Sequence, residues 1–105
     1  MREKRIAQLR ELIEQDPNDS FSRYALALEY AAIDNTAEAL TLLEDLLQRD
    51  NSYVPTYQQL GYLYQKLGRR DDAAKIFNRG IQIAAQQGDS HARSEMQDAL
   101  DELTG

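Results

Sequence analysis

The chain is 105 residues long, with 42% hydrophobic residues, no cysteine and a net charge of −6. Its length suits one small domain, and the lack of thiols excludes disulfides and thiolate chemistry. The negative charge disfavours nucleic acid as a ligand, because neutralising phosphates takes clustered Lys and Arg. With no signal-peptide core and no run of about 18 apolar residues, we expect a cytoplasmic protein without a membrane partner.

Apolar residues recur at helical spacing along the chain and predict an all-α fold. In chain order, helices are expected at about residues 2–15, 20–33, 36–49, 53–67, 70–86 and 89–103. The buried stripe of the first helix is expected to include Leu12, and that of the second Ile33. The last segment, residues 89–103, carries charged side chains on its solvent-facing side, which is typical of a helix that caps the end of a repeat array.

Turn-forming residues mark the boundaries between these helices. Asp19 or Ser20 is placed to cap the second helix and Thr36 the third, while Asn35 is expected to adopt the left-handed backbone of the intervening turn. The later boundaries carry Pro55, Gly68, Asp71, Asp72 and Gly88. Proline in the first turn and glycine after the last are the usual signals for where a helix starts and stops.

The second to fifth helices echo one another after 34 residues. Leu26, Ala27, Tyr30, Ala39 and Leu43 recur as Leu60, Gly61, Tyr64, Ala73 and Phe77. Small Ala27 and Gly61, facing Ala39 and Ala73, are expected to let paired helices approach closely. The aromatic members Tyr30, Tyr64 and Phe77 are expected to fill the space between units. A helix pair of this length buries its apolar face only by stacking on a neighbour.

Tyr57-x2-Leu60-Gly61-x2-Tyr64, followed by Ala73-x3-Phe77, resembles the tetratricopeptide repeat. The first copy is weaker, with Arg23 at the position of the leading aromatic. The resemblance implies a right-handed α-solenoid of antiparallel helix pairs that acts as a protein–protein adaptor. As one domain over 1–105, it comprises a leading helix at 1–17, repeats at 20–53 and 54–87, and a cap helix at 89–103. A missing closing proline at Ala85 suggests that the fifth helix runs on toward Gln87.

In tetratricopeptide domains the first helix of each pair lines a peptide-binding groove. Carried over by repeat position, the resemblance implies groove candidates at Phe21, Tyr24, Leu28, Gln58, Tyr62, Gln65 and Lys66. These residues suit a protein or peptide partner with apolar anchors. Packing of Phe21 and Leu28 against the first helix is the alternative. Members that grip a C-terminal carboxylate use Lys and Asn where Tyr24, Leu28 and Gln59 stand here, so that mode is expected to be absent.

A second hypothesis is self-association, as a homodimer or head to tail. Residues 1–10 hold four basic side chains against Glu3, whereas residues 89–105 hold five carboxylates against Arg93. Ends of opposite charge attract one another, although two solvated faces explain the same pattern. A homo-oligomer is therefore a second kind of partnership to test.

An enzyme is not expected. The lone His91 has neither a cysteine nor an obvious catalytic partner, and the acidic pairs suit helix ends better than paired-carboxylate catalysis. Metal-ligand spacings and glycine-rich phosphate loops do not occur. We therefore predict no catalytic residues, no metal ligands and no cofactor.

Overall fold

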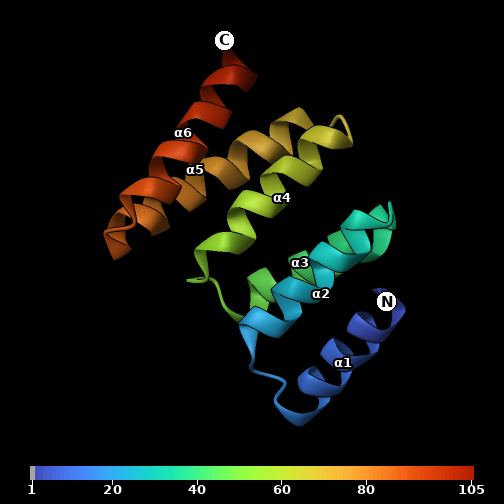
Figure 1. The fold of residues 1–105 in the computed structure, drawn as a ribbon. Coiled ribbons are helices and arrows are strands. Elements are labelled where there is room, and N and C mark those ends of the chain that lie inside the picture. The colour runs from blue at the N-terminus through green and yellow to red at the C-terminus, as the bar shows by residue number, and fades with distance from the viewer. Residues whose placement is uncertain (1) are drawn as a thin grey trace. The chain divides into compact units, whose positions relative to one another are not determined.

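The structure is a computed structural model that describes residues 2–105, and this range contains six helices and no strand. The helices are α1 (Arg2–Gln15), α2 (Ser20–Ala32), α3 (Thr36–Arg49), α4 (Val54–Lys66), α5 (Arg70–Gln87) and α6 (Ser90–Thr104) (Figure 1). Each predicted helix is present, and no boundary differs from its prediction by more than one residue. The all-α fold is confirmed, as is the extension of α5 to Gln87.

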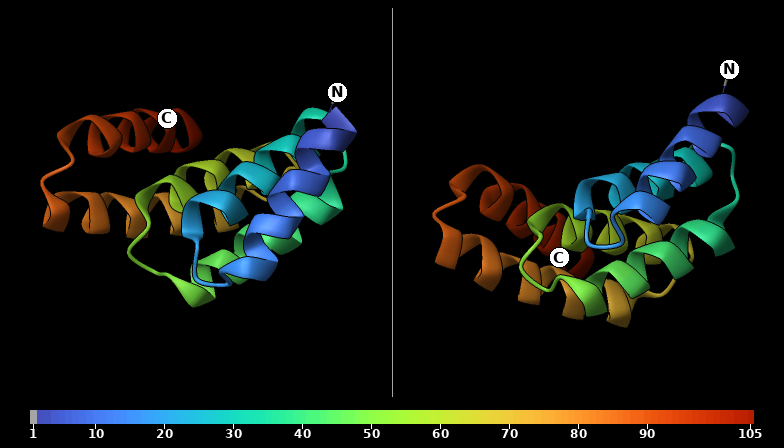
Figure 2. Two further views of the ribbon diagram at one scale, coloured as in Figure 1. Left: turned by 60° about the horizontal axis from the view of Figure 1, so that its bottom comes forward. Right: turned by 90° about the horizontal axis from the view of Figure 1, so that it is seen from below.

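The chain packs as two compact units, one up to Asn51 and one from Ser52 onward. In the first unit, α2 packs against both α1 and α3. In the second, α5 packs against both α4 and α6 (Figure 2). Helix α4 also contacts α6. Each unit is therefore a helix pair with a third helix laid against it.

The core of the first unit is aliphatic, and polar contacts from α1 supplement it. Its buried apolar side chains include Leu9, Leu26, Ala27, Ala39, Leu43 and Leu46. On α1, the Arg10 guanidinium donates to the Tyr30 hydroxyl and lies 5.5 Å from the centre of that ring. Arg2 pairs with Glu29 at 3.3 Å. Two of the basic residues near the N-terminus thus hold α1 on α2.

Two residues predicted to be buried in this unit are exposed. Leu12 is 46% exposed, because α1 buries only a narrow stripe of its surface against α2, and Leu9 lies at the centre of that stripe. Ile33 is 48% exposed, since it caps α2 beyond the last helical turn and its side chain leaves the buried stripe. Apolar spacing alone overestimated the width of both buried faces.

The predicted caps of the first unit are partly confirmed. Asp19 caps α2, and its carboxylate accepts a hydrogen bond from the Ser22 amide at 3.0 Å. For α3 the prediction was wrong, because Asn35 is the cap and accepts from the Glu38 amide at 3.4 Å. Thr36 already lies within the helix, so the preceding residue is the one placed to cap it. The left-handed backbone also falls on Asp34, with φ of 59°, rather than on Asn35.

The core of the second unit combines aliphatic residues with three aromatic side chains and Met96. Tyr57, Leu60, Phe77 and Met96 are fully buried, and Tyr64 is almost so. Gly61 makes room for the Phe77 ring, since a Cβ built there would lie 2.2 Å from the Phe77 Cε1. Sequence analysis predicted that Gly61 faces Ala73 and that Phe77 fills the space between units. The structure corrects the first prediction, because the side chain closest to Gly61 is that of Phe77.

Gly80 of α5 is a second close approach, which sequence analysis missed. A Cβ there would lie 2.5 Å from the Met96 Sδ and 2.6 Å from the Tyr57 Cβ. Because Gly80 has no side chain, α5 approaches both α4 and α6 closely at this residue. The helix ends are as predicted: Pro55 lies in the first turn of α4, and Gly68 and Gly88 adopt left-handed backbone after α4 and α5.

Candidate peptide-binding site

Three of the predicted site residues share the outward face of α2. Phe21, Tyr24 and Leu28 follow the spacing i, i+3, i+7, which places them together, opposite the buried Leu26. Phe21 is 61% exposed, whereas Tyr24 and Leu28 are half-buried. Phe21 therefore does not pack into the core, and this face presents apolar area to solvent.

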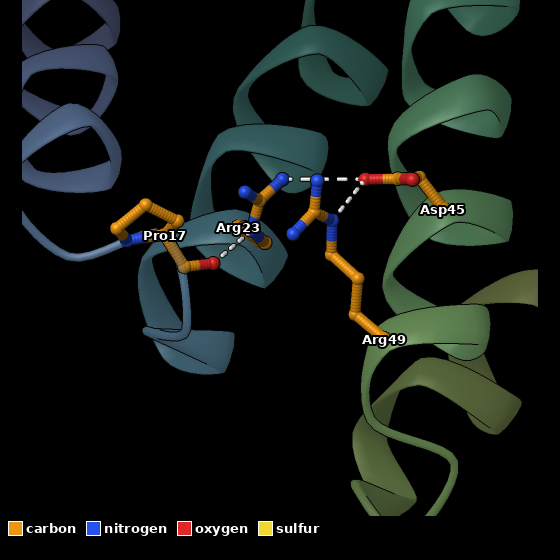
Figure 3. A network of polar contacts seen from close by, with 4 residues as sticks. All are labelled: Pro17, Arg23, Asp45 and Arg49. Atoms are coloured by element: carbon orange, nitrogen blue, oxygen red, sulfur yellow. Dashed lines mark hydrogen bonds and ion pairs between the residues drawn. The ribbon is translucent and has the colours of Figure 1, made fainter.

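A polar network holds α2 in place at the position where the family pattern has an aromatic residue (Figure 3). The Arg23 Nε donates to the Pro17 carbonyl at 2.8 Å, and the Arg23 Nη1 donates to the Asp45 Oδ2 at 3.3 Å. The same carboxylate accepts from the Arg49 Nε at 2.8 Å. Only 11% of the Arg23 side chain is exposed, whereas Asp45 and Arg49 are nearly half exposed, so the network is buried on its Arg23 side and open to water on the other. They join α2 to α3 and to the preceding loop, and so orient the outward face of α2.

A second set of predicted residues shares one face of α4. Gln58, Tyr62 and Gln65 are spaced i, i+4, i+7, and the two glutamines are half-buried. Tyr62 is 39% exposed, and its ring meets the Phe77 ring edge-on, with centroids 5.6 Å apart. Tyr62 therefore both supports the core and faces solvent. Lys66, the remaining candidate, is exposed at the end of α4.

Helix α6 adds two charged residues to the surroundings of Tyr62. Glu95 and Glu102 are seven residues apart and lie on the same side of α6. Burial, and then the negative charges of these two carboxylates, raise the pKa of the Tyr62 hydroxyl above its ordinary value. Sequence analysis missed both residues because it took site positions only from α2 and α4. Their i, i+7 spacing on the cap helix was the available signal.

An open hollow lies within the second unit, next to the Tyr62 face. It has a volume of about 290 Å³ and is lined by Gln65, Gly68, Arg70 and Leu103. Gln65 is thus common to the α4 face and to the hollow. Its lining combines the polar side chains of Gln65 and Arg70 with the apolar side chain of Leu103.

The other predicted chemistry concerns metals, membranes and His91. Within residues 2–105, no group of three or more His, Cys, Asp or Glu side chains is arranged to hold a metal ion. None of the helices in that range is long and apolar enough to cross a membrane. The His91 side chain is 88% exposed, and its Nε2 lies 2.7 Å from the Glu95 carboxylate.

Comparison with known proteins identifies several similar chains. A family model described as tetratricopeptide repeat matches residues 31–99. A tetratricopeptide repeat domain protein from Salinibacter ruber, known from a crystal structure, is 45% identical, with a TM-score of 0.80 over 83% of this chain and 98% of that one. A Bordetella parapertussis protein is 26% identical, with a TM-score of 0.80 over 94% of this chain and 86% of the other.

The fold extends to more distant proteins. The TPR2B domain of yeast Sti1, in its complex with pHsp70, has a TM-score of 0.87 at 14% identity, over 94% of this chain and 79% of that one. At that identity the likeness concerns the fold alone. No curated protein matches the chain.

Proposed function

Because the chain belongs to the tetratricopeptide repeat family, we propose that it binds peptide segments of partner proteins on two faces, the outward face of α2 in the first unit and the outward face of α4 in the second. Repeats of this family are generally protein–protein interaction modules. Family membership does not by itself assign peptide binding to these two faces, and that assignment is what we propose. The expected partner is a protein or peptide with apolar anchor residues, and binding requires no cofactor.

The observation that carries the proposal is the exposure of aromatic side chains on these faces. Phe21 is 61% and Tyr62 39% exposed, and Tyr24 is half-buried, whereas the remaining aromatic residues of the same two helices, Tyr30, Tyr57 and Tyr64, are buried. Exposed apolar area of this kind is typical of binding surfaces. Tyrosine suits the role, because its ring supplies contact area at a small entropic cost and its hydroxyl bonds to a peptide backbone.

The proposal predicts that peptides selected by the wild-type protein lose affinity for variants of the two faces. A random dodecapeptide library on phage is selected against the wild type, and the enriched peptides are then measured by calorimetry. We expect Tyr24→Ala and Tyr62→Ala each to cost about 1 kcal/mol or more of binding, which is about fivefold in Kd. Loss of the edge contact with Phe77 is expected to cost Tyr62→Ala about 0.5–1.5 kcal/mol of folding as well.

Leu12→Ala is the matched control, because it removes an exposed apolar side chain from α1. Its affinity for the selected peptides should equal that of the wild type. Urea unfolding of every variant separates lost binding from lost folding. If the selected peptides bind the Tyr24→Ala/Tyr62→Ala double variant as tightly as the wild type, the assignment of these faces is wrong.

A second candidate function, self-association, is favoured by the 46% exposure of Leu12 on α1. Helix α1 lies at the edge of the first unit, with this apolar side chain turned away from its core. The charge argument for head-to-tail assembly is weaker, because Arg2 and Arg10 engage Glu29 and Tyr30 within their own unit. A second copy of the chain would therefore use the Leu12 side of α1.

A further inference from the structure

Arg23 and Asp45 occupy positions that recur 34 residues later as Tyr57 and Arg79. In the first unit the two side chains form an ion pair, in which the Arg23 Nη1 lies 3.3 Å from the Asp45 Oδ2. In the second unit, the Arg79 guanidinium lies 5.9 Å from the centre of the Tyr57 ring. The same pair of positions therefore joins α2 to α3 by an ionic contact and α4 to α5 by a cation–π contact.

The space around this contact differs between the two helix pairs. A hollow of about 180 Å³ lies between the start of α2 and the end of α3, and its lining includes Ser20, Arg23 and Leu46. Tyr57, in contrast, is fully buried, and a Cβ built at Gly80, the counterpart of Leu46, would lie 2.6 Å from the Tyr57 Cβ. Direct packing therefore joins α4 to α5 at this position, whereas polar links across a hollow join α2 to α3.

Those polar links hold the first turn of α2. The Arg23 Nε donates to the Pro17 carbonyl at 2.8 Å, so the guanidinium lies between the preceding loop and α3 (Figure 3). Ser20 adds a second link, because its hydroxyl donates to the Asp50 carboxylate at 2.6 Å. Phe21 lies between these two residues in the sequence and is 61% exposed, so its own side chain adds little packing that would fix the turn.

We propose, resting on the function above, that Arg23 is a positioning residue for peptide binding on the outward face of α2. By tying the first turn to α3, the Arg23–Asp45 pair holds the Phe21 side of α2 in one orientation before a peptide binds, which lowers the entropic cost of binding. The face of α4 does not depend on such a pair, because packing of Tyr57 against α5 orients that helix.

The probes are the dodecapeptides enriched by phage selection. Peptides that lose affinity only in Tyr24→Ala report on α2, and those that lose it only in Tyr62→Ala report on α4. Arg23→Met keeps an unbranched stem without a donor, and Asp45→Asn keeps the shape of the partner without its charge. We expect each change to weaken the α2 peptides about fivefold, the cost of ordering one interface side chain, and to leave the α4 peptides unchanged.

A double variant and a control separate positioning from a general loss of charge. Arg23→Met/Asp45→Asn should weaken the α2 peptides no more than Arg23→Met alone, because both changes remove the same link. Arg49→Met is the matched control, since Arg49 pairs with the same carboxylate but lies, like Asp45, on α3. It should leave both classes of peptide unchanged. An equal loss in Arg49→Met, or additive losses in the double variant, overturns the proposal.

Hydrogen exchange gives a readout that needs no peptide. The Ser22 amide in the first turn of α2 donates to the Asp19 carboxylate at 3.0 Å, and the Ala92 amide of α6 donates to Asp89 at 3.1 Å in the same kind of cap. In folded Arg23→Met, exchange should become about fivefold faster at Ser22 and stay unchanged at Ala92. If urea unfolding shows that this variant does not fold, Asp45→Asn provides the same readout.

These measurements distinguish failure of this inference from failure of the proposed function. Unchanged exchange at Ser22, or faster exchange with undiminished affinity for the α2 peptides, overturns the positioning role and leaves peptide binding intact. If the selection enriches no peptide that depends on Tyr24, peptide binding on α2 is overturned, and the positioning role falls with it whatever the exchange at Ser22.

Discussion

Gly61 and Phe77 show how tightly α4 and α5 approach each other. A Cβ at Gly61 would lie 2.2, 2.3 and 2.7 Å from three atoms of the Phe77 ring, which is itself fully buried. A rigid ring with no exposed edge has nowhere to move. The glycine of the repeat pattern is therefore required by packing against Phe77, and not by backbone conformation.

Gly61→Ala is expected to destabilise the protein. Overpacking a core costs about 1–3 kcal/mol, whereas alanine in place of glycine within a helix gains at most about 1 kcal/mol. We expect the cost to exceed the gain, and urea unfolding measures the difference. Phe77→Leu in the Gly61→Ala background should recover part of the loss, so that the double variant is more stable than the sum of the single effects predicts. A Gly61→Ala protein as stable as the wild type would contradict the close approach.

The tyrosines divide by environment as the sequence suggested, with one refinement. Tyr30, Tyr57 and Tyr64 are buried, which confirms their structural role. Tyr62 was expected to stand apart from the core, yet its ring touches that of Phe77. Repeat position alone does not show this contact, because it depends on the distance between α4 and α5.

At the level of the helix, Asp19 shows how α2 begins. Its carboxylate accepts from the Ser22 hydroxyl at 2.6 Å and from the Ser22 amide at 3.0 Å. These hydrogen bonds, the hydroxyl's first, lower the pKa of Asp19 below its ordinary value of 3.8. A lowered pKa in the folded state means that the ionised carboxylate stabilises the fold. That stabilisation is complete above the unfolded-state pKa and is lost as the pH falls through the folded-state value.

Asp19→Ala is expected to cost about 1 kcal/mol at neutral pH, because the amide loses its capping acceptor. Asp19→Asn keeps an acceptor and should lose less. Denaturant unfolding of the three proteins from neutral pH down to about pH 3 tests the charge, because the advantage of the wild type over Asp19→Asn should shrink below pH 3.8. An advantage that is constant across this range would show that the ionised carboxylate is not responsible.

For the molecule as a whole, the two candidate functions differ in oligomeric state. Self-association through Leu12 predicts a dimer in sedimentation velocity that Leu12→Ala makes monomeric. Ionic end-to-end assembly instead predicts dissociation between about 50 and 500 mM salt, since added ions screen exposed charges. A wild-type monomer at every protein and salt concentration tested would leave peptide binding as the remaining candidate.

Sequence analysis located all six helices, because apolar periodicity marks each one and Asp, Asn, Pro and Gly mark its ends. It also identified the family from the pattern around Tyr57, Gly61 and Phe77, which the comparisons confirm. These features depend on neighbours within a few turns of the chain. Helix positions and the repeat pattern are therefore local features, which the sequence alone predicts.

Only the tertiary structure showed which residues meet across helices. It placed Phe77 against Gly61, brought α5 to Tyr57 and Met96 through Gly80, and showed that burial, followed by the charges of Glu95 and Glu102, raises the pKa of Tyr62. It also left Leu12 and Ile33 exposed. Helical periodicity says which face of a helix is apolar, but the distance and rotation between helices decide how much of that face is covered. The sequence by itself determined the helices and the family, whereas packing between helices decided the chemistry of the candidate site.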